Sequence, residues 1–290
     1  MTSQNGSIAG LEKIVDHGPN ASRYNLVMLG DGYQTAELPK YAADVATFIA
    51  KFQNTPPYTA LWNGINVFRV DVVSNDSLAA PPAAGGPQPQ TYFDSTFGAG
   101  GSLGRLLTCD EDGAFETAKS QAPEALMVFV IVNTPQYGGS GGKVAVFSTA
   151  ESAAEIGLHE MGHTAFGFAD EYACYQGCGS GETGHDRYAF GEPSEPNVTA
   201  INAADQLKWR AQLSQAGDPF PTTANGDCGD CDKQVNPQAA TYVGLYEGGR
   251  YFHCGCYRPS FDCRMRTLGV DFCAVCQAVI IAKLQPYLAD

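Results

Sequence analysis

The sequence predicts an α/β fold in which helices cover a twisted, mixed β-sheet. The main observation is that apolar segments of strand length alternate, over the first half of the chain, with segments whose apolar residues recur at helical spacing. In addition, 290 residues with 44% hydrophobic content are enough to bury a core in one large or two small domains.

The first elements form a strand, a helix and a second strand. Residues 24–29 predict a strand that ends in a glycine turn, and residues 65–73 predict the next one. Between them a helix is predicted up to Pro56 from apolar residues at helical spacing, namely Tyr41, Val45, Phe48, Ile49 and Phe52. Residues 79–102 are so rich in Ala, Pro and Gly that we expect a long surface loop.

Further strands follow this loop. A short helix at residues 113–120 leads into an apolar strand at 126–133. The glycine-rich stretch 137–142 predicts a turn, and residues 143–147 predict another strand. This order extends the alternation of helices and strands typical of an α/β sheet.

The next helix carries the clearest start and stop signals. It begins at Ser148 or Ser152, because each of these serines is followed three residues later by a Glu, as in a capping box. We expect it to end near Gly167. One side of it follows the helical period and is predicted to face the core: Ala154, Leu158, Met161 and Ala165.

The last part of the chain has a looser pattern. Residues 174–197 and 218–238 are loop-like, and a final helix is predicted at about 272–288. We therefore predict a single domain with two parts. Residues 1–167 form an N-terminal subdomain, and residues 168–290 form a loop-rich, cysteine-stapled C-terminal subdomain.

Charge and hydropathy exclude several classes of partner. The 31 acidic and 17 basic residues give a net charge of −14, which disfavours nucleic acids and anionic membranes as partners. No apolar run approaches the roughly 18 residues that span a bilayer, so we expect no transmembrane segment. We also expect a monomer. The start of the given chain lacks the apolar region of a secretory signal peptide.

The cysteines point to an oxidising environment. Ten cysteines, most of them in the last third of a weakly charged chain, favour disulfides and an extracellular protein. The alternative is a structural zinc site made of two Cys-x-x-Cys pairs, Cys228 with Cys231 and Cys273 with Cys276. The separation of the pairs exceeds that of a usual zinc ribbon.

The motif with the most chemical content is His159-Glu160-x-x-His163, the H-E-x-x-H pattern of zinc-dependent peptide hydrolases. Residues four apart lie on the same face of a helix, so the two imidazoles can bind one metal ion. Glu160 projects toward the open side of that ion, where a carboxylate can take a proton from water. The motif therefore predicts a Zn²⁺-dependent hydrolase with Glu160 as its general base.

A catalytic zinc ion usually has a third protein ligand. In metzincins the motif continues as H-E-x-x-H-x-x-G-x-x-H, where the glycine permits a left-handed turn before the last ligand. Here Gly167 and Asp170 keep the glycine-to-ligand spacing, one residue later and with Asp in place of His. In the gluzincin arrangement the ligand is a distant Glu, for which the candidates are Glu182, Glu192 and Glu195.

Several blocks together resemble one family. They are Leu-Gly-Asp-Gly-Tyr at 29–33, the glycine-rich stretch 133–142, residues 159–172 with their Asp-Glu-Tyr ending, Tyr-Arg-Pro at 257–259, and Cys-Arg-Met-Arg at 263–266. In this order they resemble the immunoglobulin A peptidase family of bacterial, metzincin-like zinc metalloendopeptidases.

The resemblance implies a metzincin-like fold and hydrolysis of a protein or peptide substrate. It also implies the residues of the site: the zinc ligands His159, His163 and Asp170, and the general base Glu160. Met265 is implied to form the turn beneath the metal. Glu171 competes with Asp170 as the third ligand, because it is adjacent and its side chain is longer.

Two further expectations concern the substrate. The strand at 143–147 is expected to be the sheet edge with which an extended substrate pairs its main chain. The alternatives to an endopeptidase are an inactive binding domain stabilised by zinc or disulfides, and a hydrolase of a non-protein amide such as a cell-wall peptide. Because an inactive descendant is free to lose its general base, the presence of Glu160 favours an enzyme.

Overall fold

The chain forms two compact units. The computed structural model describes residues 5–78, 88–98, 104–175, 184–215, 219–231 and 235–288. The first unit combines Met1–Ala165 with the C-terminal segment Ala282–Asp290, and the second unit is Phe166–Ile281. The expectation that both parts act as one metallopeptidase domain stays a prediction.

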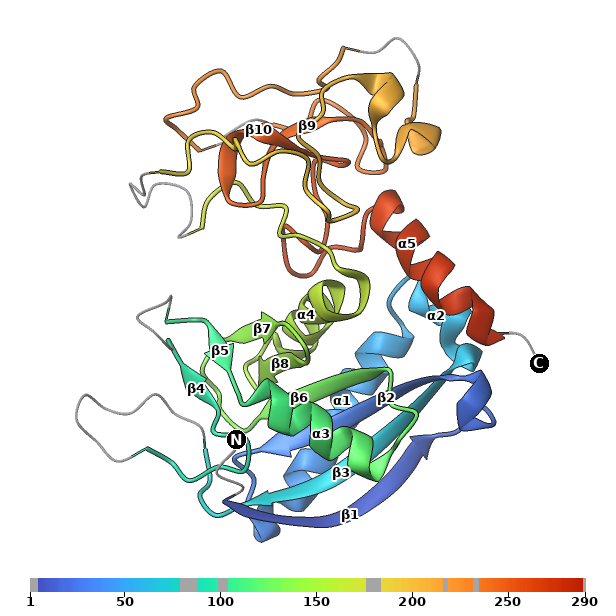
Figure 1. Cartoon of the computed structure of the whole chain (residues 1–290), viewed down its shortest axis with the longest axis vertical. Helices are drawn as coiled ribbons and strands as arrows, with labels where there is room; N and C mark the ends of the chain where they lie inside the picture. The colour runs from blue at the N-terminus through green and yellow to red at the C-terminus, as the bar shows by residue number, and fades with distance from the viewer. Residues whose placement is uncertain are drawn as a thin grey trace. The chain divides into compact units, whose positions relative to one another are not determined.

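A six-stranded mixed sheet is the centre of the first unit (Figure 1), with the strand order β1-β3-β2-β6-β8-β7. The strands β3, β2, β6 and β8 are parallel to one another, and the two outer strands β1 and β7 are antiparallel to their neighbours. The strands are β1 (Gly6–Val15), β2 (Tyr24–Asp31), β3 (Ile65–Ser74), β6 (Met127–Val132), β7 (Gly139–Gly141) and β8 (Ala145–Ser148). The predicted α/β class with a mixed sheet is confirmed.

Helices cover both faces of this sheet. They are α1 (Leu38–Gln53), the short α2 (Tyr58–Leu61), α3 (Glu111–Gln121) and α4 (Ala153–Phe166). Two short strands, β4 (Thr96–Phe97) and β5 (Leu107–Thr108), pair separately. Single 3-10 turns occur at Asn20–Ser22, Thr35–Glu37, Trp62–Gly64, Ala204–Gln206, Arg210–Gln212 and Gln285–Leu288.

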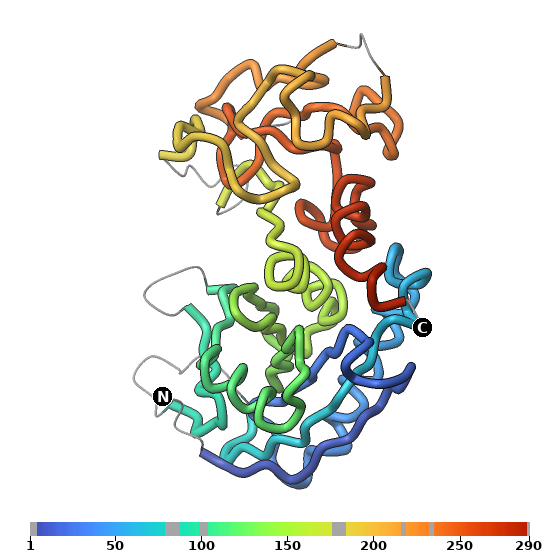
Figure 2. Tube along the Cα trace, turned by 45° about the vertical axis from the view of Figure 1, so that its right-hand side comes forward, coloured from blue at the N-terminus to red at the C-terminus, as the bar shows by residue number. Residues whose placement is uncertain are grey.

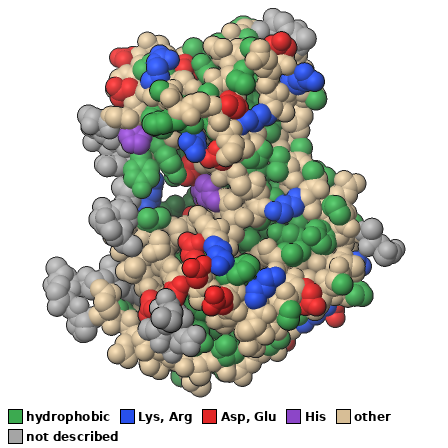
Figure 3. All heavy atoms as spheres, in the orientation of Figure 1, with side chains coloured by type: hydrophobic (Ala, Val, Ile, Leu, Met, Phe, Trp, Pro, Cys, Tyr) green, Lys and Arg blue, Asp and Glu red, His purple; other side chains and the backbone are tan. Residues whose placement is uncertain are grey.

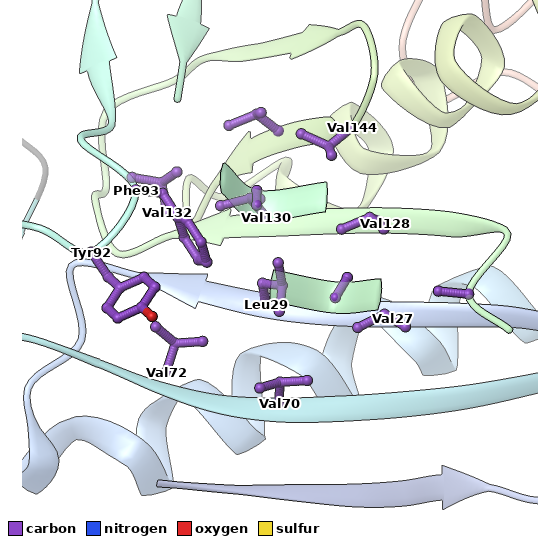
Figure 4. Close-up of a cluster of buried hydrophobic side chains, with 14 of the residues drawn as sticks. Val27, Leu29, Val70, Val72, Tyr92, Phe93, Val128, Val130, Val132 and Val144 are labelled. Carbon is purple, nitrogen blue, oxygen red and sulfur yellow. The ribbon is translucent and has the colours of Figure 1, made fainter. Parts of the chain in front are cut away.

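One face of the sheet packs against α3. Alternate residues of the central strands, such as Leu29 in β2 and Val130 in β6, are fully buried there beside Ala114 and Ala118 of α3. Figure 4 shows how the valines of neighbouring strands line up into this layer, with Phe93 closing one end. Because parallel strands are buried on both faces, they are apolar throughout, which made them visible in the sequence.

The opposite face packs against α1 and α4. Phe48 of α1 lies 5.0 Å, ring centre to ring centre, from both Phe129 of β6 and Phe147 of β8. Gly157 lets α4 approach the same rings, since a Cβ atom there would lie only 2.7 Å from Phe48 and 3.0 Å from Phe147. The sheet and α1 therefore fix the position of α4.

Two strands differ from the prediction. The stretch 137–142, predicted as a turn, contains the edge strand β7, so β8 lies between β6 and β7. The prediction that strand 143–147 is an edge available to substrate is therefore wrong. β7 consists of Gly, Ser and Gly, and it has no alternating apolar pattern to reveal it. The outer strand β1 was also missed, because its residues are exposed or half-buried and no apolar face marks it.

Part of the predicted loop 79–102 lies outside the described residues, namely 79–87 and 99–103. The described piece between them is well anchored. The amides of Phe93 and Ser95 donate hydrogen bonds to the buried carboxylate of Asp31, at 2.9 and 3.1 Å. This segment covers the end of the sheet instead of extending into solvent.

Irregular loops make up most of the second unit, as the yellow and orange tube in Figure 2 shows. Its regular elements are the hairpin of β9 (Tyr246–Gly249) and β10 (Phe252–Arg258), and the helix α5 (Ala274–Leu284), whose last turn belongs to the first unit. Of the predicted loops 174–197 and 218–238, residues 176–183, 216–218 and 232–234 lie outside the described part.

Two disulfides cross-link these loops. Cys174 pairs with Cys231, and Cys228 pairs with Cys254, closing 57 and 26 residues of chain. The expected cysteine stapling is confirmed. Since Cys228 and Cys231 are each bonded to a distant cysteine, the alternative of a zinc ribbon made of two Cys-x-x-Cys pairs is wrong.

The end of the chain belongs to the first unit. After Ala282, the ring of Tyr287 contacts that of Tyr24 at 5.3 Å, and the Lys283 ammonium donates to the carbonyl of Ala165. The last helix, predicted to reach residue 288, ends at Leu284 and continues as a 3-10 turn.

The helices and the surface charges bear on the expected partners. Among the described residues, the helices are all too short or too polar to cross a membrane. On the face in Figure 3, the described Lys and Arg side chains are interspersed with Asp and Glu side chains and do not gather into a basic patch. The net charge of −14 likewise disfavours a polyanionic partner.

Candidate active site

The helix α4 presents the H-E-x-x-H motif because its other residues are held in the core. It begins after Ser152, whose carbonyl accepts hydrogen bonds from the amides of Glu155 and Ile156, both at 3.0 Å. Ser148, the other predicted start, is the last residue of β8. Four residues were predicted to face the core. Three of them are buried, namely Leu158, Met161 and Ala165, and Ala154 is half-buried.

His159 and His163 converge as the motif predicts. Their Nε2 atoms lie 3.1 Å apart, and both rings are half-buried. A tetrahedral zinc ion with Zn–N bonds of about 2.0–2.1 Å would separate two nitrogen ligands by about 3.3 Å. The spacing of the two imidazoles therefore fits a shared metal ion.

Glu160 completes this group. The residue is 8% exposed, and one ligand atom from each of Glu160, His159 and His163 lies within 4.8 Å of the others. A carboxylate so close to the imidazoles can exchange a proton with a water bound between them. The structure thus brings together the three motif residues on the first unit.

The backbone of β7 passes directly over the motif. A Cβ atom at Gly139 would lie 2.7 Å from the Glu160 carboxylate, and one at Gly141 would lie 2.5 Å from Cβ of His163. Only glycine permits such a close approach. The sequence had marked this stretch as a turn with no chemical role. The sequence signal that could have identified these two positions is a pair of glycines in a strand position shortly before the motif helix.

The chain leaves α4 through the expected left-handed turn. Gly167 has a φ of 66°, a conformation that favours glycine. Three residues later, Asp170 lies in the second unit, is 6% exposed, and accepts a hydrogen bond from the hydroxyl of Tyr251. Its assignment as the third metal ligand stays a prediction.

The tip of the β9–β10 hairpin holds the segment around Asp170. Arg250 and Tyr251 both have left-handed backbones, with φ of 53° and 71°, an arrangement usual for Asn-Gly and unfavourable for bulkier residues. Their amides donate to the carbonyls of Asp170 at 2.9 Å and Tyr172 at 3.0 Å. Such strained residues persist where the surrounding structure requires them, which makes this tip a candidate functional element.

Glu171, the competing ligand, is engaged differently. Its side chain is fully buried and accepts hydrogen bonds from Asn197 at 2.9 Å and from the Cys276 thiol at 3.7 Å. Burial raises the pKa of Glu171 well above its ordinary value, and the neighbouring Cys273 adds to the shift. These contacts engage the Glu171 carboxylate inside the second unit.

The distant glutamates also have other partners. Glu192 accepts from Thr199 at 2.8 Å and pairs with Lys208 at 3.0 Å, and Glu195 pairs with Arg250 at 2.8 Å. Glu182 lies outside the described residues. The described glutamates thus serve to hold loops of the second unit.

Met265 is fully buried in a tight turn. The amides of Arg266 and Thr267 both donate to the carbonyl of Cys263, at 2.8 and 2.9 Å. The Met265 carbonyl accepts a hydrogen bond from the amide of Glu171 at 2.8 Å. The turn is therefore tied directly to the segment that carries Asp170, while its role as a Met-turn stays a prediction.

Comparison with known protein families decides the identity of the chain. The model of the family described as IgA Peptidase M64 matches residues 13–233 and 233–284. The chain belongs to this family. This match confirms the resemblance found in the sequence blocks. As a member of the IgA peptidase M64 family, the protein is a peptidase with a protein or peptide substrate. A comparison with curated proteins gives no match.

Membership in the IgA peptidase M64 family implies a metal-dependent peptidase, and the described residues contain three groups able to bind a metal. One is the motif on α4. Another combines Cys174, Cys231 and His253, but its two cysteines form a disulfide. The last consists of four buried residues, Glu171, Cys263, Cys273 and Cys276.

Proposed function

We propose that this member of the IgA peptidase M64 family is a zinc-dependent, metzincin-like endopeptidase. The observation that carries the proposal is the convergence of the His159 and His163 Nε2 atoms, 3.1 Å apart, with the Glu160 carboxylate beside them. Two imidazoles and a carboxylate in the H-E-x-x-H arrangement are the donor set of a catalytic zinc ion and its general base.

His159, His163 and Asp170 would hold the ion. When bound, zinc supplies Lewis acidity, which makes water acidic near neutral pH and polarises a peptide carbonyl. The choice of Asp170 is supported by the left-handed Gly167 and by the hydrogen bond from Tyr251, which fixes the orientation of its carboxylate. Such hydrogen bonds to a ligand are typical of metal sites.

Glu160 moves the proton in this mechanism. Its carboxylate takes a proton from the attacking water and then returns it to the nitrogen of the departing amine. The β7 backbone at Gly139 limits the space around this carboxylate and so restricts its positions. A restricted base needs little rearrangement during the reaction, which favours catalysis.

The disulfides support a location outside the cytosol, because disulfides persist in oxidising compartments. The two other functions stay open to test. An inactive binding domain would bind peptides without cleaving them, and a hydrolase of cell-wall amides would leave ordinary proteins intact. The close grouping of Glu160 with both histidines favours turnover over binding alone.

The decisive experiment compares Glu160→Gln with wild type on an unfolded protein substrate. Removing the general base is expected to lower kcat by roughly 10²–10⁴-fold. Zinc content, measured by mass spectrometry of the metal, should stay unchanged in Glu160→Gln and fall in His163→Ala. Glu151→Gln is the matched control, because this exposed glutamate lies just before the same helix.

The cleavage products separate the alternatives. Internal new termini, identified by mass spectrometry, are expected for an endopeptidase. Equal cleavage by wild type and Glu160→Gln would refute the mechanism. Cleavage of cell-wall peptides without cleavage of proteins would favour the amide hydrolase, and binding without any product would favour the inactive domain.

A further inference from the structure

A second cluster of metal-binding side chains lies inside the second unit and shares no residue with the H-E-x-x-H motif. Glu171, Cys263, Cys273 and Cys276 are all buried, and one ligand atom from each lies within 4.8 Å of the others. The three cysteines are free thiols. Three sulfurs and a carboxylate oxygen form a complete set of four donors, as in closed structural zinc sites.

The distances fit a tetrahedral ion better than a disulfide. The Sγ atoms of Cys263 and Cys276 lie 3.8 Å apart, and Sγ of Cys276 lies 3.7 Å from Oε1 of Glu171. Zn–S bonds of about 2.3 Å in a tetrahedron separate two sulfurs by about 3.8 Å, whereas sulfurs in a disulfide are about 2.05 Å apart.

A backbone amide also points at one of the sulfurs in the cluster. The amide of Cys273 donates to the sulfur of Cys263 at 3.3 Å. Amide-to-sulfur hydrogen bonds of this kind commonly stabilise thiolates that bind metals.

Glu171 supplies an independent geometric observation. Its Oε2 atom is buried and accepts no hydrogen bond from the residues that the structure describes. Leaving a buried carboxylate oxygen unsatisfied is costly unless a cation or a donor reaches it. A metal ion between Glu171 and the three sulfurs would satisfy this oxygen.

Buried arginines balance the charge. Three thiolates, one carboxylate and a divalent ion leave about two negative charges in a buried site. Arg258 and Arg264 are also buried, at 0% and 1% exposure, and the charge of Arg258 interacts with that of Glu171. Buried charges are tolerated when they compensate one another in this way.

We propose that Cys263, Cys273, Cys276 and Glu171 bind a structural zinc ion. Soft thiolates select zinc over harder cations, and the four donors leave no open position for a substrate. The ion would join the Glu171 segment, the turn that contains Met265, and the start of α5. It would therefore hold the neighbours of Asp170 in place without taking part in peptide hydrolysis.

Cobalt substitution tests the proposal independently of peptidase activity. Thiolate-to-cobalt charge-transfer bands appear in the near ultraviolet only if sulfur binds the ion, so the His159–His163 site cannot produce them. The full-length protein loaded with Co²⁺ is expected to show these bands. The variant His159→Ala/His163→Ala should keep them and still bind one equivalent of Zn²⁺.

Variants of the cluster complete the test. Cys273→Ser should lose the bands and one equivalent of zinc, whereas Cys256→Ser, which alters a buried free thiol outside the cluster, should keep both. Glu171→Gln is a milder variant that keeps all sulfurs, and it should shift the bands even if Cys273→Ser does not fold. Absence of the bands in wild type would overturn the proposal. So would a disulfide between two of the cluster cysteines, found by mass mapping of the denatured protein.

Discussion

The two units hold their site residues by different means. In the first unit, His159 and His163 belong to a regular helix that packs by carbon contacts onto a sheet, and the backbone of β7 lies against them. In the second unit, Asp170 belongs to an irregular segment fixed by hydrogen bonds from Tyr251 and Arg250. Close packing of atoms holds the site residues of the first unit, whereas polar contacts and disulfide cross-links hold the second unit.

This difference predicts which kind of change should disturb the structure of each region. Close-packed atoms resist added volume, so a single extra carbon displaces them. A loop held by directional hydrogen bonds tolerates changes of volume but loosens when a donor is removed or an acceptor is protonated. The comparison can therefore be tested with one change of volume, one deleted hydroxyl and one change of pH.

The largest effect is expected from Gly139→Ala. The new Cβ atom would lie 2.6 Å from Ile156 and 2.7 Å from the Glu160 carboxylate, so the base must move. A displacement of about 1 Å in a catalytic group can lower activity by about 10²-fold. The measurement is kcat on an unfolded protein, together with the unfolding midpoint.

Gly138→Ala is the control for this prediction. Its Cβ atom would clash with the Phe97 ring at 2.4 Å and with the carbonyl of Arg105 at 2.8 Å, but not with the motif. Both variants should lose stability, and only Gly139→Ala should lose activity per folded molecule. Equal losses of activity in the two variants would show that the β7 backbone does not position Glu160.

A smaller effect is expected from Tyr251→Phe. The change deletes the hydroxyl that donates to Asp170 and leaves the ring in place. Loss of such a hydrogen bond to a metal ligand typically weakens metal affinity or activity by about 10–100-fold. Zinc affinity, measured by competition with a chelator, is the primary readout.

Tyr246→Phe serves as the matched control in the same hairpin. Its hydroxyl is buried and has no hydrogen-bond partner among the described residues, so its removal should change zinc affinity little. If Tyr251→Phe also bound zinc with wild-type affinity, the assignment of Asp170 as a ligand held by Tyr251 would be wrong.

The smallest effect is a difference in the response of the two units to acid. Burial alone would raise the pKa values of Glu192 and Glu195, but hydrogen bonds and the charges of Lys208 and Arg250 outweigh burial and lower both values. A lowered pKa gives stability above the unfolded value of about 4.3, and this stability is lost as pH falls through the folded value. Acid should therefore loosen the loops of the second unit that Glu192 and Glu195 hold.

The pKa of Asp31 in the first unit shifts in the opposite direction. Burial raises its pKa despite hydrogen bonds from Ser95 and Phe93. A raised carboxyl pKa gives stability below the unfolded value of about 3.9 that is lost as pH rises through the folded value, so acid favours the protonated, folded form. Hydrogen exchange at about pH 6 and pH 4, corrected for intrinsic rates, should show earlier loss of protection in the loops around Glu192 and Glu195 than in the segments around Asp31. Equal losses would contradict the comparison.

Much of the first unit was predictable because its signals are local and periodic. The apolar strands β2, β3 and β6, the helix α1, and the motif on α4 each follow from a short stretch of sequence. The edge strand β7 was missed because its Gly-Ser-Gly sequence has no alternating apolar pattern. Its function lies in close backbone approach, which depends on the helix that packs beneath it.

The second unit was less predictable because its order comes from contacts distant in sequence. The pairing of Cys174 with Cys231 and of Cys228 with Cys254 could not be derived from spacing. Nor could the strained hairpin tip at Arg250 and Tyr251, since neither residue favours a left-handed backbone.

The sequence by itself determined the α/β class, the family and the H-E-x-x-H residues, because helical spacing and motif chemistry act within a few residues. The tertiary structure decided what surrounds them. It placed β7 over Glu160, joined Tyr251 to Asp170, and gathered Glu171 with three cysteines from two distant segments. Those arrangements depend on long-range packing, which no local pattern encodes.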